Sequence, residues 1–379
     1  MKFFHISDLH LGKRLKAFSL IEDQQDILIK IAELAKEHKP DAVLIAGDVF
    51  DKPTPSIEAI QLLDRFLVWL NELGIVVFMI SGNHDSAERV SFAADLLKNS
   101  NVHIVPSYNG KIEPIRFFDD YGDVFIWMLP YLRPAIVRKH FEDREISSYN
   151  DALSAVISNM QTDASVRNVL IAHQFITGGE TSDEEIYVGN SENIDSSVFA
   201  DFDYVALGHL HRPQYIERES LRYCGSPLKY SLSEANHDKT VTVVDMADKI
   251  ETPKISLLPL NPIHDVREIR GTYAEIMNRK NYRGTNIDDF VHIVLTDEDE
   301  EFDAMAKLRA VYPNLLDLVY DNTRTQTEFS LETTNPAEGK MPLELLGEFY
   351  ENQNGIPMSE EQLTYAENLF TEIFKEIIL

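Results

Sequence analysis

Side chains of the kind that bind metal ions recur along this chain, each just after a short apolar run. The set comprises Asp8, His10, Asp48, Asn83, His173, His209 and His211. Carboxylate, imidazole and amide donors without a thiolate suit Mn, Fe or Zn rather than a soft metal. Such an inventory predicts a two-metal centre that cleaves phosphoesters.

The spacing within the motifs predicts that neighbouring ligands reach the same ion. On an extended backbone Asp8 and His10 point to one side, and His209 and His211 repeat the arrangement. Asp48 follows a glycine, which lets the backbone approach closely, and its carboxylate is placed to bridge two ions.

Taken singly, each motif is weak evidence. A D-x-H pair is often an ordinary surface pair, and a lone histidine such as His173 is more often structural. Together, however, five predicted strand ends would each have to acquire a ligand residue by accident. The joint pattern therefore indicates a metal centre.

Five apolar runs precede the ligands and are predicted to be strands buried on both faces. They are Lys2–Ser7, Ala42–Ala46, Ile75–Ser81, Val169–Ala172 and Tyr204–Leu207. We expect them to bring all seven ligands to the same edge of one sheet. Amphipathic patterns predict covering helices over Leu20–Glu37 and Ser56–Leu73.

Further β-like runs predict a second sheet packed on the first. They are Val102–Val105, Ile112–Phe117, Val124–Met128, Thr240–Val244 and Ile255–Leu258. The pattern changes near residue 260, and residues 262–335 are predicted to form a small α/β module that ends in a polar stretch. Two helices are predicted over residues 341–379, and the last opens with a capping box of Ser359 and Gln362.

Charge and composition restrict the classes of function. The net charge is −28, from 63 acidic and 35 basic residues, which argues against a chain that binds nucleic acid by itself. Bound divalent cations reverse the local field, however, and a partner can supply phosphate contacts. No apolar run approaches the roughly 20 residues needed to span a bilayer, and no signal peptide is recognisable. The only cysteine, Cys224, is predicted to be a buried filler in a cytoplasmic protein.

The motifs D-x-H, G-D, G-N-H-D, a lone His and G-H-x-H, in this order, resemble the calcineurin-like metallophosphoesterases. Within that superfamily the chain resembles the SbcD family, the nuclease subunits of bacterial SbcCD complexes and relatives of the double-strand-break repair nuclease. The segments that carry this resemblance are Ser7–Gly12, Gly47–Asp51 with Pro55-Ser56, and Tyr223–Pro227.

The resemblance covers essentially the whole chain and implies its architecture. It implies a four-layer α/β/β/α sandwich over residues 1–260, which would be the nuclease domain. A small α/β capping domain that positions DNA would follow at residues 262–335. Helices at residues 341–379 would then bind the SbcC ATPase.

The resemblance also assigns roles to the ligands. One ion would be held by Asp8, His10 and His211, and the other by Asn83, His173 and His209, with Asp48 bridging the two. In the family both ions are typically manganese, although the ligand types alone leave Mg, Fe and Zn open.

His84 matches the family's catalytic histidine, which hydrogen-bonds the scissile phosphate or protonates the leaving oxygen. We hypothesise that Asp51 orients His84 and raises its basicity, with a solvated loop carboxylate as the alternative. Basic residues near these loops could contact DNA phosphates. They are Lys13, Arg14, Lys16, Lys52, Arg89 and Arg212.

The resemblance implies two Mn-dependent activities, exonuclease cleavage of double strands and endonuclease cleavage of single strands or hairpins. These activities would be gated by SbcC and act in DNA repair, replication and recombination. Helices Ser56–Leu73 and Arg89–Asn99 lie where the family forms a homodimer, within a complex of two copies of each subunit. The expected location is the cytoplasm, at the nucleoid, with no membrane partner.

Two alternatives from other classes are a metallophosphatase or phosphodiesterase acting on a small substrate, and a non-catalytic scaffold for DNA ends. The protein phosphatases of the superfamily extend the second motif to G-D-x-x-D-R-G and end the third in Glu. Here Lys52 follows Asp51, and the third motif ends in Asp85. The intact ligand set with His84 speaks against a scaffold.

Overall fold

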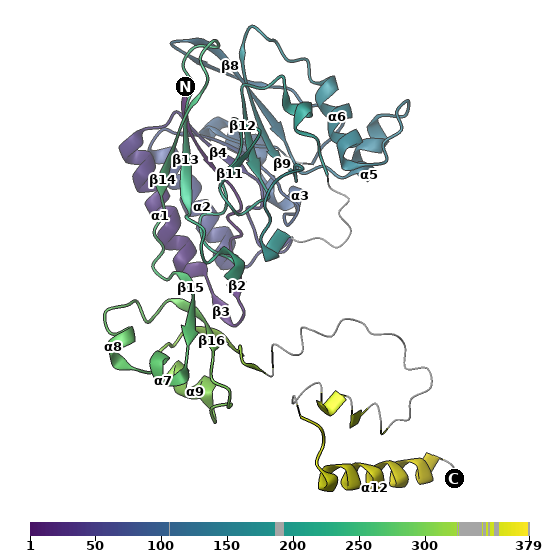
Figure 1. Cartoon of the computed structure of the whole chain (residues 1–379). Helices are drawn as coiled ribbons and strands as arrows, with labels where there is room; N and C mark the ends of the chain where they lie inside the picture. The colour runs from purple at the N-terminus through teal and green to yellow at the C-terminus, as the bar shows by residue number, and fades with distance from the viewer. Residues whose placement is uncertain are drawn as a thin grey trace. The chain divides into compact units, whose positions relative to one another are not determined.

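The chain forms two compact units, Met1–Arg267 and Glu268–Leu379. The computed structural model describes residues 1–105, 107–185, 193–323, 325, 343, 346, 347, 349–351 and 356–377. Figure 1 shows the helices and strands, coloured from the N-terminus to the C-terminus.

The first unit contains a six-stranded sheet in the order β14-β13-β1-β4-β5-β6. Its strands are β1 (Lys2–Ile6), β4 (Ala42–Ala46), β5 (Val76–Ile80), β6 (Val102–Val105), β13 (Thr240–Asp245) and β14 (Lys254–Pro259). Strands β1, β4, β5 and β6 run parallel, and β13 and β14 add an antiparallel edge. Helices α1 (Ile21–His38) and α2 (Ile57–Glu72) bury apolar faces, as the amphipathic patterns predict.

A second six-stranded sheet has the order β11-β12-β10-β9-β8-β7. Its strands are β7 (Ile115–Asp119), β8 (Gly122–Leu129), β9 (Arg167–His173), β10 (Tyr204–Gly208), β11 (Gln214–Ile216) and β12 (Arg218–Tyr223). The four inner strands are parallel, with β7 and β11 antiparallel at the two edges.

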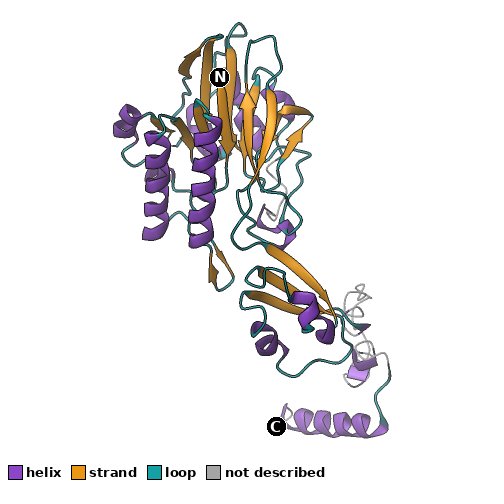
Figure 2. Ribbon diagram, turned by 90° about the vertical axis from the view of Figure 1, so that its left-hand side faces the viewer, coloured by secondary structure: helices purple, strands orange, loops and turns teal. Residues whose placement is uncertain are grey.

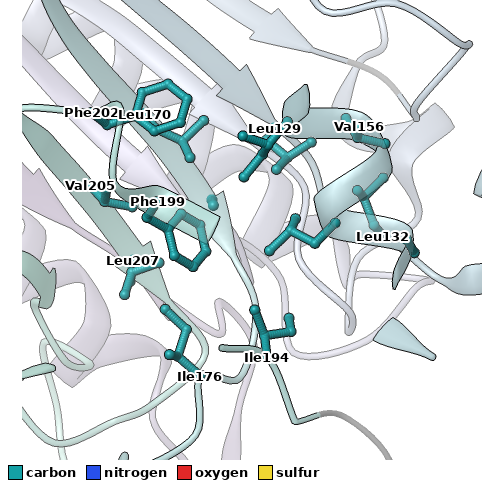
Figure 3. Close-up of a cluster of buried hydrophobic side chains, with 14 of the residues drawn as sticks. Leu129, Leu132, Val156, Leu170, Ile176, Ile194, Phe199, Phe202, Val205 and Leu207 are labelled. Atoms are coloured by element: carbon teal, nitrogen blue, oxygen red, sulfur yellow. The ribbon is translucent and has the colours of Figure 1, made fainter. Parts of the chain in front are cut away.

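Side chains alternate between two cores along the strands of the second sheet. In β8, Ile126 and Met128 pack into the core between the sheets, with Phe3 and Phe78 of the first sheet. Trp127 and Leu129 point the other way, into the core that Figure 3 shows together with Val156 of α6 (Tyr149–Asn159). The layers are therefore helices, sheet, sheet and helix, and the predicted four-layer α/β/β/α sandwich is confirmed (Figure 2).

Two expectations about the sheets are wrong in detail. The strands that precede the ligands do not share one sheet, because β9 and β10 belong to the second sheet. Conversely, β6, β13 and β14 join the first sheet instead of the second. Periodicity identifies a buried strand but carries no information on which sheet it enters.

Short elements complete the first unit. They are β2 (Arg14–Leu15), β3 (Phe18–Ser19), α3 (Ala87–Val90), α4 (Ala94–Leu97), α5 (Pro134–Val137) and the 3₁₀ turns Lys98–Ser100, Arg138–His140, Asp183–Glu185, Ser196–Phe199 and Leu232–Glu234. The single helix expected over Arg89–Asn99 is broken. Ala93 has a left-handed backbone with φ of 60°, which ends one helical turn before the next begins.

The second unit contains strands and short helices, as expected of a small α/β module. Its elements are β15 (Val266–Gly271), α7 (Tyr273–Ile276), α8 (Arg279–Tyr282), β16 (Phe290–Leu295), α9 (Ala304–Arg309) and β17 (Leu315–Tyr320). The three strands form a sheet in the order β15-β16-β17, whose helices close a small core around Ile293 and Leu308.

The last helix, α12 (Glu360–Ile377), begins at the predicted capping box. Ser359 N donates to Gln362 Oε1 at 2.9 Å, and Gln362 N donates to Ser359 Oγ at 3.3 Å. Most of the other predicted C-terminal helix lies outside the described residues, as does most of the polar stretch before it. Among the described residues, no helix combines the length and apolar character that crossing a bilayer requires.

Candidate metal centre

The seven candidate ligands meet where the two sheets present the carboxyl ends of their parallel strands. Asp8 and His10 follow β1, Asp48 follows β4 and Asn83 follows β5 in the first sheet. In the second sheet β9 ends on His173, and β10 is followed by the remaining two ligands, His209 and His211. The ligands therefore come together between two sheets, and not along one.

The ligand loops are not extended, although the same-side argument assumed an extended backbone. Asp8 and His10 still bring their donors into one group, whereas His209 and His211 lie in different groups. Asp8, His10 and Asp48 have left-handed backbones with φ of 52°, 42° and 47°, and His209 has φ of 105°. Such conformations cost non-glycine residues energy and persist where surrounding contacts enforce them. Here Asp8 N donates to Gly47 O and His10 N to Asp48 O, each at 3.0 Å, so the first two loops fix each other.

Glycines let the loops approach His173. A Cβ on Gly47 would lie 2.5 Å from His173 Nδ1, and one on Gly208 would lie 2.7 Å from the same atom. No side chain fits at either position without displacing the imidazole. The glycine of the G-D motif and the glycine of the G-H-x-H motif therefore make room for a ligand from a third strand.

The first group of donors consists of Asp8, His10 and His211, whose ligand atoms lie within 4.8 Å of one another. His10 Nε2 lies 3.2 Å from His211 Nε2. All three side chains are buried.

The second group consists of Asn83, His173 and His209. Asn83 Oδ1 lies 2.9 Å from His173 Nε2 and 3.1 Å from His209 Nδ1. Asp48 lies between the two groups, because its Oδ2 is 3.3 Å from His173 Nε2 and 3.7 Å from His10 Nε2.

These separations fit metal coordination. Donors bound at about 2.0–2.2 Å around one ion lie roughly 3.0–3.5 Å from one another. The pairs His10–His211, His173–Asn83 and His173–Asp48 fall in or close to this range. The donor set thus fits two hard or borderline divalent ions.

Burial and close packing shift the pKa values of the donors. Burial raises the pKa of Asp8, whereas the neighbouring histidines, chiefly His173, overcome burial and lower the pKa of Asp48. Burial lowers the pKa of His209 to about 3, with repulsion from His173 adding to it. For His173 burial also favours the neutral form, but the Asp48 carboxylate outweighs it and raises the pKa to about 9. Metal cations would replace the proton that Asp48 and His173 share.

His84 lies beside the donors with its ring partly buried. Its backbone N donates to Asp48 Oδ1 at 2.9 Å, and its ring packs edge-on against His10 with centroids 4.9 Å apart. Its Nδ1–H donates to the carbonyl oxygen of Asp51 at 3.2 Å. That bond fixes the tautomer and leaves Nε2 for a substrate.

The hypothesis that Asp51 orients His84 and raises its basicity is wrong for the Asp51 carboxylate. The Asp51 carboxylate pairs with Lys13 Nζ at 3.2 Å and lies 4.0 Å from His10 Nδ1, while only its backbone carbonyl reaches His84. The turn after Asp48 brings the main chain of residue 51 to His84 and directs its side chain toward His10. Sequence spacing alone does not distinguish these orientations.

Supporting residues outside the predicted set hold the ligand loops. The partly buried Asp85 carboxylate accepts hydrogen bonds from Val49 N, Phe50 N and Gly82 N at 2.9–3.0 Å, and so joins the second and third loops. Gln24 Nε2 donates to His10 O at 2.7 Å. Asp85 ends the recognisable G-N-H-D motif, whereas Gln24 lies in no motif.

The six basic residues predicted near the ligand loops differ in their exposure and in their contacts. Lys13 is mostly buried and paired with Asp51, Arg89 donates to Pro53 O at 2.6 Å, and Arg212 pairs with Glu180. Arg14 and Lys52 are exposed, and Lys16 follows in the β2–β3 turn. Cys224 is fully buried, as expected of a filler, and burial raises the pKa of its thiol.

Comparison with known proteins agrees with this geometry. The family described as calcineurin-like phosphoesterase matches residues 1–213, and the type 5 capsule protein repressor C-terminal domain (SbcD_C) matches residues 262–354. The SbcD component of the nuclease SbcCD from Staphylococcus epidermidis is 33% identical over 381 residues, covering 98% of this chain and 99% of the relative. The chain belongs to the SbcD family.

Membership makes this SbcD-family chain a metal-dependent phosphodiester hydrolase of the calcineurin-like class. Two solved structures are also similar, a dimetal phosphatase from Danio rerio and TT1561 of Thermus thermophilus. Each is 12% identical and covers 69% of this chain and 99% of its own, with TM-scores of 0.40 and 0.39.

Proposed function

We propose that the chain is a DNA nuclease subunit that hydrolyses phosphodiesters at a two-manganese centre. The observation that carries the proposal is the pair of buried donor groups that share Asp48, with His84 beside them. In this proposal Asp8, His10 and His211 hold one ion, Asn83, His173 and His209 hold the other, and Asp48 bridges them.

Each part of the site has a chemical role in this proposal. Ions held by these donors would supply Lewis acidity to a phosphate and to an attacking water molecule. His84 hydrogen-bonds the scissile phosphate through Nε2 or protonates the leaving oxygen. The backbone N of His84 donates to Asp48 Oδ1 at 2.9 Å, and this bond fixes the position of His84 relative to the metal ligands.

Membership of the family supports a proposal for the substrate and the partner. A relative that matches 98% of this chain is named as a component of SbcCD, and the SbcD_C match extends to residue 354. We propose that residues 341–379 bind the SbcC ATPase, which gates cutting, and that residues 262–335 cap the DNA. The proposed substrates are double-stranded ends, single strands and hairpins, in repair, replication and recombination at the cytoplasmic nucleoid.

The exposed apolar side chains of α2, of α4 and of the turn between α3 and α4 support a homodimer within a complex of two copies of each subunit. Ile57 and Ile60 of α2 are exposed, as are Phe92 and Leu96, and a hollow lined by both segments lies beside them. Apolar patches of this kind mark protein interfaces. We propose that a second copy of this chain covers the patch.

The deciding experiment compares purified protein with and without SbcC, in Mn²⁺, on hairpin DNA and on p-nitrophenyl phosphate. We expect Mn-dependent DNA cleavage that SbcC and ATP stimulate and that His84→Ala lowers by roughly 10²–10⁴-fold, with weak monoester turnover. Efficient monoester hydrolysis without DNA cleavage under any of these conditions would favour a phosphatase. Metal and DNA binding without any hydrolysis would favour a scaffold.

A further inference from the structure

A buried cluster of charged side chains lies directly behind His211, outside the donor set. Glu234 ends the 3₁₀ turn Leu232–Glu234 and has an exposed fraction of 0%, and Lys239, just before β13, is 4% exposed. Burying two charges is costly unless their geometry satisfies every donor and acceptor. Both members of this pair contact His211.

Glu234 contacts the imidazole of a candidate ligand on the side away from the metal centre. Its Oε1 accepts a hydrogen bond from His211 Nδ1 at 3.0 Å. That bond places the proton on Nδ1 and directs the Nε2 lone pair toward His10 Nε2, 3.2 Å away. Such carboxylate–histidine pairs fix ring orientation and make the coordinating nitrogen more basic.

Lys239 fixes Glu234 in turn. Its ammonium group has three N–H donors and finds three acceptors: Glu234 Oε2 at 2.5 Å, Ser226 Oγ at 2.8 Å and His211 O at 2.9 Å. The backbone of His211 and the carboxylate that holds its ring are therefore bound by one cation. Protein atoms alone satisfy every donor of this ammonium group.

The motif Tyr223–Pro227, one of the segments that carry the family resemblance, acquires a role here. Ser226 N donates to His211 O at 3.2 Å, and a Cβ on Gly225 would lie 2.7 Å from the same oxygen. Gly225 has φ of +77°, a conformation that also favours glycine. The motif thus lets its chain pass against His211 and supplies the serine that Lys239 binds.

The second donor group differs at the histidine that corresponds to His211. His173 Nδ1 donates to the backbone carbonyl of Ala46 at 2.8 Å, a neutral acceptor. A buried carboxylate stabilises the bound imidazole more strongly than a carbonyl does, because its charge acts at low dielectric. The acceptor behind the ring is therefore a carboxylate at His211 and a neutral carbonyl at His173.

We propose that Glu234 is a positioning residue that presents His211 Nε2 to the ion held with Asp8 and His10, with Lys239 as its fixed countercharge. The proposal rests on the proposed two-metal centre and deepens it. It makes the two ions unequal, since one depends on the Glu234–Lys239 pair and the other does not.

The test is a Mn²⁺ titration followed by electron paramagnetic resonance on the full chain and on Glu234→Gln/Lys239→Met. This double variant keeps the side-chain volumes and removes both charges together. We expect one of the two bound Mn²⁺ ions to weaken about 10–100-fold, the range for loss of such a support, while the other is unchanged. The matched control is Asp203→Asn/Lys249→Met, which removes a 2.7 Å ion pair elsewhere and should leave both affinities unchanged.

Glu234→Asp decides the matter if the double variant does not fold, because it keeps the charge for Lys239 but shortens the reach to His211. Selective weakening of one ion in this variant supports the proposal. Equal weakening of both ions with a lowered Tm, or wild-type affinities for both, would overturn it. A wild-type chain that binds no Mn²⁺ would instead refute the two-metal function itself.

Discussion

The ring nitrogens of His84 lie close enough to the donors to be compatible with two roles. Its Nδ1 is engaged by the Asp51 carbonyl, yet one of its ring nitrogens also lies within 4.8 Å of ligand atoms of His10 and Asp48. A metal ligand and a proton donor both fit this position, but only loss of a ligand would lower the number of bound ions.

We expect His84→Ala to bind two Mn²⁺ ions like the wild type and to lose roughly 10²–10⁴-fold in single-turnover DNA cleavage, the usual contribution of a positioned proton donor. Metal stoichiometry and cleavage are measured on the same preparation. Loss of one ion in this variant would make His84 a ligand and contradict the role proposed for it.

His5 connects the two sheets and gives the fold a pH dependence. It is fully buried, with Nδ1 2.9 Å from Tyr204 Oη and Nε2 3.1 Å from Leu207 O, and burial lowers its pKa to about 3. The unfolded chain takes up a proton near the ordinary value of about 6.5, and the folded chain does so only near pH 3. Stability due to neutral His5 is therefore full above pH 6.5 and is lost as pH falls toward 3.

We expect His5→Gln, whose amide can still donate to Leu207 O, to remove this dependence. Between pH 6 and 4 the wild type should lose about 1.4 kcal/mol of unfolding free energy per pH unit more than the variant. Denaturant unfolding of metal-free protein at several pH values measures the difference. Parallel curves for the two proteins would show that His5 does not titrate on unfolding.

Residue types and order were enough to predict which seven side chains gather, because each follows a recognisable buried strand. They were not enough to predict the left-handed turns at Asp8 and Asp48, or the direction of the Asp51 carboxylate. Those depend on hydrogen bonds between loops of different strands. Glu234 was not predictable for the same reason, since its contact with His211 joins residues 23 positions apart in no shared motif.

At the scale of elements, hydrophobic periodicity located the strands and the amphipathic helices α1 and α2. The partition of strands between two sheets was not predictable, because buried parallel strands look alike in sequence. The break between α3 and α4 was also missed, since alanine at position 93 normally favours a helix.

Helix α12 leaves apolar side chains in solvent. Tyr365 is 71% exposed and Leu369 is 46% exposed, one turn apart on the same face, while Ala366 is buried. A helix that shows apolar side chains at this spacing suits a groove in a partner.

We expect Tyr365→Glu/Leu369→Glu to abolish co-purification with SbcC and the stimulation by ATP, while the Mn-dependent activity of the chain alone is unchanged. Glu361→Lys, an exposed change on the same helix, is the control and should retain SbcC. If the double variant still bound SbcC with wild-type affinity, the partner site would lie elsewhere.

At the scale of the whole molecule, a charge of −28 opposes both proposed associations, with DNA and with a second copy. DNA binding must therefore rely on the bound cations and on SbcC. A homodimer must rely on apolar burial, and Phe92, which is 81% exposed, is the most prominent apolar side chain of the α2–α4 patch.

The opposition of charge repulsion and apolar burial predicts whether salt strengthens or weakens the homodimer. Because two copies of −28 repel each other, raising NaCl from 50 to about 300 mM, which shortens the screening length from about 14 to about 6 Å, should tighten the dimer. Phe92→Glu should give a 43.3 kDa monomer at both salt concentrations by sedimentation equilibrium, whereas Phe118→Glu, on β7 and 70% exposed, should dimerise like the wild type. A dimer that weakens with salt would be held by ion pairs, and one that survives Phe92→Glu would use another surface.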